Sequence, residues 1–296
     1  MPGRGSCSAP GRWSVWAAVS PGPEYILTPP QSPDAAPRGD PYLEGLATAL
    51  VAITLFLAGR LLLSDFGLVG VAVAEWVALA GFPVAVLLLR RRNLRDGLAL
   101  RGAPPGAAPA TVLLGLGALP LAWSAFWMAS AVAPVDPGAV RILGRELVAQ
   151  DGGELVPILI LAAVTPAVCE ELLFRGLLLG TLLDRHTPFV AVGASAAVFA
   201  LLHWTPEASA RMAPTLVLGL LLGWAVWRSG SIWVGVLTHL VYNATLLVGA
   251  AWSVGPGLPR PEAPPTALVL TGIALLAAGT HVLMIRSPHP PADARS

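Results

Sequence analysis

The sequence predicts an all-α fold, a polytopic transmembrane helical bundle with about eight spans. Three observations lead to this prediction. Hydrophobic residues make up 55% of the 296-residue chain, charged residues make up 12%, and the mean hydropathy is +0.70. A soluble domain carries about 25% charged residues, so much of this apolar surface must face lipid. Apolar stretches close to the roughly 20 residues that cross a bilayer also recur along the chain, separated by Pro and Gly.

Each expected span is rich in Leu, Ala and Val. In chain order the spans are residues 44–63, 67–89, 109–133, 155–183, 188–204, 212–227, 231–252 and 266–285. The fourth is the longest and is expected to tilt or to emerge into solvent.

The remaining segments flank or interrupt this array. Residues 1–40 are rich in Pro and Gly and are predicted to be a disordered tail. The transmembrane domain is then 41–286, and 287–296 form a C-terminal tail. A short interfacial helix is expected within residues 136–151, which contain the stretch VRILGRELVAQ.

Arginine placement predicts the orientation in the membrane. The loop after the second span, RRRNLRDGLALR, carries five arginines between Arg90 and Arg101. Because short basic loops stay on the cytoplasmic side, both termini are predicted to be cytoplasmic. The net charge of +1 gives no electrostatic argument for binding nucleic acid, so membrane lipid is the expected surrounding partner.

Ionisable and polar side chains inside the spans are few and lie in three groups. The sequence EELLFRG in the fourth span holds Glu170, Glu171 and Arg175; FALLH in the fifth ends at His203; and HLVYN in the seventh holds His239 and Asn243. Charges at this depth are costly and usually functional. Glu75, in the second span, stands outside these groups and lies either at a helix contact or beside the cavity.

Helix geometry separates the roles of these residues. Glu171 and Arg175 are four residues apart and can form an ion pair. Glu170 is rotated by about 100° from Glu171, so it can face the reaction centre. His239 and Asn243 also share a face, and Phe199 stands one turn before His203 as an apolar wall.

A carboxylate, two imidazoles and a carboxamide in one apolar cavity can hydrolyse a peptide bond. Glu170 could act as the general base and one histidine could share the activation of water, while the second histidine and Asn243 could donate hydrogen bonds to the oxyanion. Alternatively Glu170, His203 and His239 could bind Zn²⁺ with an open position for water. Zinc and a metal-free glutamate mechanism remain equally open at this point.

These three segments resemble the EExxxR, FxxxH and HxxxN motifs of the CAAX protease and bacteriocin-processing family, which includes the Ras-converting CAAX prenyl endopeptidases. The resemblance covers residues 155–252. It implies an intramembrane endopeptidase, metallo- or glutamate-dependent, that acts on membrane-associated and in some members lipidated peptides or proteins. By this resemblance Glu170, His203, His239 and Asn243 would be catalytic. Glu170 and His203 would activate water, His239 and Asn243 would stabilise the oxyanion, and Glu171 and Arg175 would support them. The expected location is the cell membrane of a bacterium.

A non-enzymatic membrane protein is the rival interpretation. A transporter or an immunity-type binding protein could hold a ligand in the same polar cavity. Transporters usually contain internal repeats with paired broken helices. The two halves of this sequence show no convincing repeat, and the polar groups lie in the second half, which favours the protease.

Overall fold

The computed structural model describes residues 39–133, 135, 136, 138, 152–253 and 262–287. Within these residues the chain is helical and has no strand, which confirms the all-α prediction. The same residues include seven helices that are long and apolar enough to cross a membrane, and Pro188–Leu202 is a shorter apolar helix. Together they give the bundle of about eight spans. Nearly all of the expected tails, and most of the expected interfacial helix, fall outside the described residues.

The first half of the bundle consists of three spans, the second of which is built from consecutive pieces. Its elements are α1 (Pro41–Leu62), a 3₁₀ turn η1 (Ser64–Phe66), α2 (Gly67–Ala74), a π-helical turn η2 (Glu75–Gly81), α3 (Phe82–Leu89), the short α4 (Leu94–Gly97) and α5 (Ala108–Ser130). A π-helical turn replaces the i→i+4 bond by an i→i+5 bond, and such turns are frequent at functional sites.

The second half contains the three motifs. Its elements are α7 (Gly152–Leu159), the π turn η3 (Ile160–Val164), α8 (Thr165–Glu171), the π turn η4 (Leu172–Leu178), α9 (Leu179–Leu183), α10 (Pro188–Leu202), the 3₁₀ turn η5 (Pro206–Arg211), α11 (Met212–Ser229), α12 (Ile232–Ser253) and α13 (Thr266–Arg286). The segments α7 to α9 form one continuous span of 30 residues from Glu154 to Leu183.

Local sequence signals explain several helix ends. At the start of α1, the Asp40 side chain accepts a hydrogen bond from the backbone N–H of Tyr42, and Pro41 occupies the first helical position. At the end of α11, Gly230 adopts φ = 66°, the left-handed conformation that glycine adopts without a steric penalty.

The fifth span is shorter than the sequence predicted. The helix α10 has 15 residues and ends at Leu202, so His203 caps its C-terminus instead of lying within it. Fifteen residues reach about 22 Å, less than the roughly 30 Å of a hydrocarbon core. The reason is Pro206, because the residue before a proline disfavours the helical conformation, and Thr205 is extended at φ = −137°.

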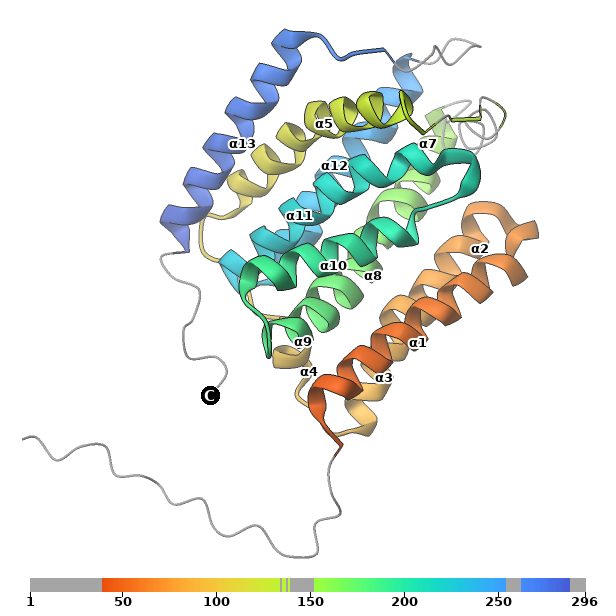
Figure 1. Ribbon diagram of the computed structural model, residues 1–296, viewed down its shortest axis with the longest axis vertical. Coiled ribbons are helices and arrows are strands. Elements are labelled where there is room, and N and C mark those ends of the chain that lie inside the picture. Colours follow the sequence, from red (N-terminus) through yellow and green to blue (C-terminus); the bar gives the residue numbers. More distant parts are fainter. Residues whose placement is uncertain (1–38, 134, 137, 139–151, 254–261, 288–296) are drawn as a thin grey trace, which may run out of the picture. The chain divides into compact units, whose positions relative to one another are not determined.

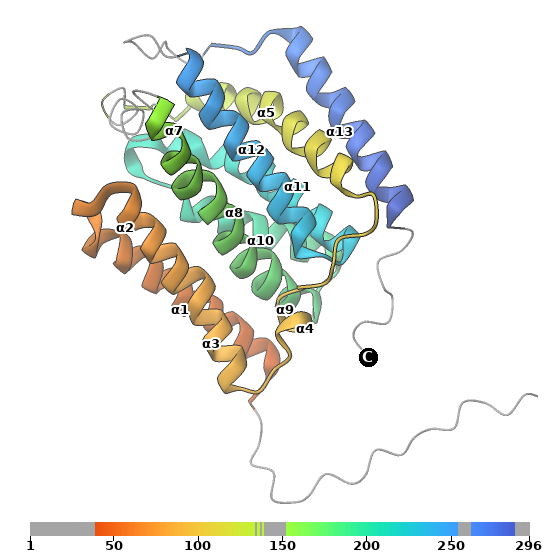
Figure 2. The same cartoon turned by 180° about the vertical axis from the view of Figure 1, so that it is seen from behind.

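The helices pack in two groups. Helix α5 lies against α11, α12 and α13, and α10 lies against α11. The elements α1, α2, η2 and α3 form a second group, which contacts the motif-bearing span through η2, α8 and η4. Figures 1 and 2 show this arrangement from opposite sides. The span α7–α9 therefore lies between the two groups and meets both.

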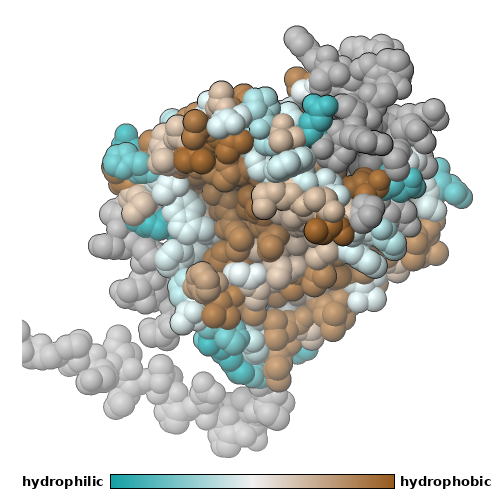
Figure 3. Space-filling model, turned by 45° about the horizontal axis from the view of Figure 1, so that its top comes forward, coloured by the Kyte–Doolittle hydropathy of each residue, from teal (hydrophilic) through white to brown (hydrophobic). Residues whose placement is uncertain are grey.

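The surface is that of a protein surrounded by lipid. Large apolar side chains are widely exposed, among them Leu62 at 81%, Leu89 at 83% and Phe189 at 90%. Figure 3 shows hydrophobic residues over the middle of one face and hydrophilic residues mainly toward its margins. A water-soluble monomer rarely exposes apolar patches of this extent. The chain is an integral membrane protein.

Most of the described arginines gather at one end of the bundle. The loop after α3 carries Arg90, Arg91, Arg92, Arg95 and Arg101, and it contacts the start of α12, where Ser231 Oγ donates to the backbone oxygen of Arg101 at 2.6 Å. Arg185 pairs with Asp40, and Arg228 donates to the backbone of Met284 near the end of α13. The start of α1 and the end of α13 therefore lie at this same end.

We expect this arginine-rich end to face the cytoplasm, because short basic loops resist translocation. In a background lacking Cys7 and Cys169, single cysteines at Asp96, Glu207 and Arg260 can be probed on intact cells with a membrane-impermeant thiol reagent. Labelling is expected at positions 207 and 260 and not at 96. Labelling at 96 alone would reverse the orientation and leave the arrangement of the helices unchanged.

Candidate active site

The most extensively bonded part of the site is a buried ion pair within the first motif. Arg175 Nη1 donates to Glu171 Oε1 at 2.8 Å, and both side chains are fully buried. Arg175 Nη2 also donates to the backbone oxygen of Gly219 on α11 at 3.3 Å. The guanidinium lies 4.3 Å from the centre of the Phe199 ring. The ion pair predicted from the four-residue spacing is confirmed, and it ties α8 and η4 to α10 and α11.

Glu171 also holds the first histidine of the third motif. His239 Nδ1 lies 3.1 Å from Glu171 Oε1, so the same oxygen binds Arg175 and His239. Helix α12 can approach this closely because Gly235 stands one turn before His239. A Cβ atom at position 235 would lie 2.7 Å from Glu171 Oε2 and 2.6 Å from a methyl group of Val226.

Glu170 points away from this ion pair and toward both histidines. Its Oε1 lies 3.6 Å from His203 Nε2, and its Oε2 lies 3.8 Å from His239 Nε2. Glu170 and His239 are buried, and His203 retains 24% of its side-chain exposure. The structure thus brings together Glu170, His203 and His239 from three helices, and the 100° rotation between the two glutamates separates their contacts as predicted.

The partners of the two Nδ1 atoms determine what each histidine can offer Glu170. His203 Nδ1 lies 2.9 Å from the backbone oxygen of Phe199, which can only accept a hydrogen bond. The Glu171 carboxylate likewise only accepts from His239. Both Nδ1 atoms must therefore carry hydrogen, and each neutral ring presents a lone pair on Nε2 toward Glu170. The two Nε2 lone pairs lie 3.6 and 3.8 Å from the oxygens of Glu170. This arrangement of acceptors suits a hydrogen-bond donor shared between them, such as water, or a cation.

Phe199 is more central than a wall of the cavity. Its ring makes edge contacts with the rings of His203 at 4.8 Å, Phe174 at 5.1 Å and His239 at 6.0 Å. The side chain is 1% exposed. One aromatic ring therefore positions both histidines and stacks on Arg175, and sequence spacing alone gave no signal of this.

The π turn η4 contributes a further contact that the sequence analysis missed. The backbone oxygen of Phe174 accepts from the N–H of Leu179, five residues later, and also from Ser195 Oγ on α10 at 2.9 Å. Ser195 is buried. This bond fixes α10 against the first motif, so it helps to hold Phe199 and His203 in position.

Asn243 is the least engaged of the expected site residues. It lies one turn after His239 on α12 and is half-buried. Its side chain makes no hydrogen bond to another described residue, whereas Glu170, His203 and His239 face one another. Its amide is therefore free to bind a group that enters the site.

The chemical types of Glu170, His203 and His239 suit zinc, but their spacing is wider than that of a formed site. Zinc bonds of about 2.0–2.2 Å in a tetrahedron place neighbouring ligand atoms about 3.3 Å apart. The two distances to Glu170 are 3.6 and 3.8 Å. Among the described residues, no group of three His, Cys, Asp or Glu side chains has the arrangement of a metal site. Small side-chain movements would shorten these separations to those of a zinc site, so Glu170, His203 and His239 fit zinc by their chemical types.

A separate cavity of about 830 Å³ opens at the arginine-rich end of the bundle. Its lining includes Arg90, Arg92 and Arg101 near the loop after α3, and it reaches Arg175 and Gly176. Glu170, His203 and His239 do not line it. The cavity therefore approaches the ion pair that supports the site, and not the three groups that face one another.

A comparison with known protein families matches the part of the chain that contains the three motifs. Residues 152–245 match the family described as type II CAAX prenyl endopeptidase Rce1-like. No curated protein and no solved structure matches the chain. The match spans all three motifs and confirms the family predicted from them.

Proposed function

Because residues 152–245 match the Rce1-like CAAX prenyl endopeptidases, which are membrane proteases, we propose that Glu170 and His203 activate the water that cleaves the substrate. The observation that supports this mechanism is the convergence of Glu170 with the Nε2 atoms of His203 and His239. The proposed substrate is a membrane-associated peptide or protein, including lipidated ones.

In the first step, a water molecule bound between Glu170 and His203 attacks the carbonyl carbon of the scissile bond. One proton of the water passes to Glu170, a carbon–oxygen bond forms, and the carbonyl oxygen becomes an oxyanion. The amide of Asn243 donates a hydrogen bond to this oxyanion. His239 can also donate in its imidazolium form, which takes its second proton from solvent before the substrate binds and is stabilised by the Glu171 carboxylate beside Nδ1.

In the second step, the tetrahedral intermediate collapses. Glu170 returns its proton to the nitrogen of the scissile bond, the carbon–nitrogen bond breaks, and the products are a carboxylic acid and an amine. The ion pair of Glu171 with Arg175 keeps its charge throughout. Its role is to hold His239 by Nδ1 and to keep α8, α11 and α12 in register.

Zinc gives a second version of the same site. Glu170, His203 and His239 would hold the ion, which would supply a Lewis acid that polarises the carbonyl and acidifies bound water. In that version Glu171 would orient His239 through Nδ1, as carboxylates commonly do beside metal-binding histidines.

A cleavage assay with purified protein tests the proposed function. A farnesylated peptide that ends in a CAAX sequence, with a quenched fluorophore across the expected bond, is a suitable probe because the matched family acts on prenylated CAAX proteins. We expect cleavage in detergent or nanodiscs. The same peptide without its lipid tests whether lipidation is needed. Binding of the peptide without any cleavage would favour the non-catalytic alternative, a membrane binding, immunity or transport protein.

Removal of metal distinguishes the two versions. Since the mechanism above needs no metal, we expect cleavage to persist after dialysis against a zinc chelator, with metal content checked by mass spectrometry. Activity that disappears on chelation and returns with Zn²⁺ but not with Mg²⁺ would assign water activation to zinc. Either result leaves Glu170, His203 and His239 essential.

A further inference from the structure

A second buried glutamate lies outside the three motifs. Glu75 is 5% exposed, and its carboxyl makes no hydrogen bond and no ion pair with any described residue. Its Oε2 is a buried acceptor that lacks a partner within that part of the chain. Buried polar atoms nearly always have a partner, so such an acceptor calls for an explanation.

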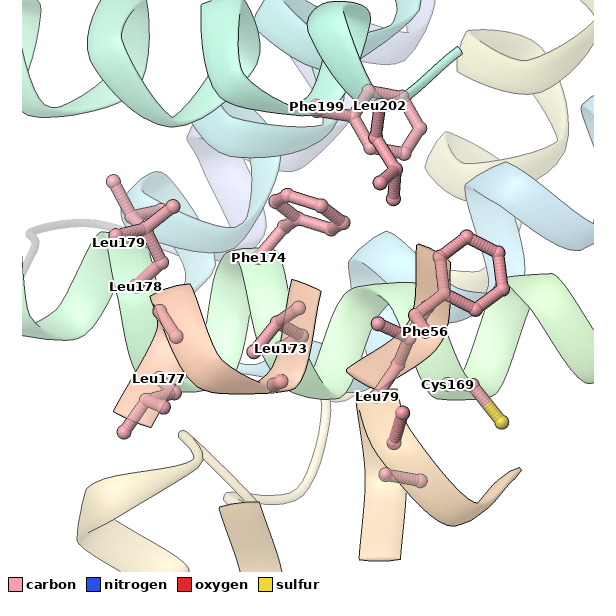
Figure 4. Packing of buried hydrophobic residues seen from close by; sticks show 14 of the residues in the cluster. Phe56, Leu79, Cys169, Leu173, Phe174, Leu177, Leu178, Leu179, Phe199 and Leu202 are labelled. Atoms are coloured by element: carbon pink, nitrogen blue, oxygen red, sulfur yellow. The ribbon is translucent and has the colours of Figure 1, made fainter. Parts of the chain in front are cut away.

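Glu75 lies beside the span that carries Glu170. It is the first residue of the π turn η2, and η2 packs against α8. Its neighbour Trp76 is half-exposed and donates to Thr165 Oγ1 at 3.4 Å, so the opposite side of the turn, with Glu75, Ala78 and Leu79, faces the interior. Leu79 belongs to the same apolar cluster as Cys169, the residue before Glu170, and Figure 4 shows both near Phe56.

The charges around Glu75 also connect it with the site. Glu75 and Glu170 lie within electrostatic range of each other, and Cys169 is within range of both. Arg60, near the end of α1, is within range of Glu75 and of His203, yet it forms no ion pair with either. A carboxyl oxygen in this position can accept a hydrogen bond from a group bound beside Glu170.

The apolar setting of Glu75 argues against a purely structural role. Ala74 before it, and Ala78 and Leu79 about one turn after it, are all buried, and these apolar side chains can pack against α8 without a polar group. Burying a carboxyl group without a partner opposes folding. A bound molecule that donates a hydrogen bond would remove this cost, and a peptide held at Glu170 has backbone N–H groups of this kind.

We propose that Glu75 is a substrate-binding residue whose carboxyl accepts a backbone N–H of the peptide held at Glu170 and His203. This inference rests on the proposed function and assigns the span formed by α2, η2 and α3 to one side of the substrate path. The substrate then lies between the two groups of helices, with α8 behind the scissile bond. Glu75 contributes to binding rather than to the movement of protons.

Kinetics with the farnesylated CAAX peptide test the assignment. Glu75→Leu is expected to raise KM by roughly ten- to a hundredfold, because the peptide N–H would be left buried without an acceptor, with kcat within about threefold of wild type. Glu75→Gln keeps a carbonyl acceptor, so its KM should lie between those of Glu75→Leu and the wild type. The melting temperature should be unchanged or higher, since an apolar side chain replaces an unpaired buried carboxyl.

A change in the substrate identifies which peptide N–H donates to Glu75. Single peptide amides near the scissile bond are replaced by esters, one at a time, which removes one N–H each. One ester is expected to raise KM of the wild type by about tenfold and to have no further effect with Glu75→Leu. Glu44→Gln, at the other end of the neighbouring helix α1, is the control and should leave KM unchanged.

Two results would overturn the assignment. Glu75→Leu with unaltered KM would mean that the carboxyl meets no substrate, and an ester effect of equal size in both proteins would place the N–H on another acceptor. Failure of the wild type to cleave the peptide would instead contradict the proposed function. In that case, the rise in melting temperature on addition of the same peptide, compared between wild type and Glu75→Leu, still reports whether Glu75 contributes to binding.

Discussion

Replacing Glu170, His203 or His239 by alanine is expected to abolish proteolysis and to leave a folded membrane protein. The three side chains face one another at 3.6 and 3.8 Å, and none of them belongs to the apolar clusters of the bundle, so their loss removes mainly chemistry. Loss of a general base typically costs about 10²–10⁴ in rate. Because the three groups act as one unit, the double variants should be little worse than the single ones.

The chain offers matched controls for this experiment. His186 is an exposed histidine at the arginine-rich end of the bundle, where its Nε2 lies 3.1 Å from the hydroxyl of Tyr42. His186→Ala should retain normal turnover, as should Glu44→Gln. Cleavage of the farnesylated peptide is the measurement, with size-exclusion profiles to verify folding. Turnover of more than about a tenth of wild type by Glu170→Ala would show that another group accepts the proton.

Much of this site could be predicted from sequence because its spacings are local. The four-residue interval between Glu171 and Arg175 produces the observed ion pair, and the adjacent position of Glu170 produces its different direction. Apolar stretches predict the spans because lipid, unlike a folded core, imposes a minimum length. Each motif lies on its own expected span, and the structure brings Glu170, His203 and His239 together.

The features that the sequence did not reveal depend on tertiary contacts. The π turn η4 coincides with a hydrogen bond from Ser195, 21 residues away, which no local pattern encodes. The central position of Phe199 arises from the packing of α10 on α11, and the Gly219 carbonyl binds Arg175 across helices. The early end of α10 could have been found from Pro206, since the residue before proline avoids the helical conformation.

Arg175→Ala is expected to produce the largest loss of stability of any single change at the site. It removes a guanidinium that donates to Glu171 and Gly219 and lies over the Phe199 ring, and it leaves the Glu171 carboxylate buried without its cation. Breaking a fully buried ion pair costs about 3–5 kcal/mol. For a domain of this size, that corresponds to a fall in melting temperature of roughly 6–20 °C.

A double-mutant cycle separates the ion pair from the packing of the arginine stem. Glu171→Gln with Arg175→Met removes both charges and keeps much of the volume, so it should recover a large part of the stability that Arg175→Ala loses. Activity should not recover with it, because the substituted amide side chain no longer offers His239 Nδ1 a carboxylate. Thermal unfolding in detergent and cleavage of the farnesylated peptide measure the two effects. Equal melting temperatures for Arg175→Ala and wild type would show that the pair does not stabilise the fold, and recovery of both stability and activity in the double variant would show that Glu171 does not act through His239.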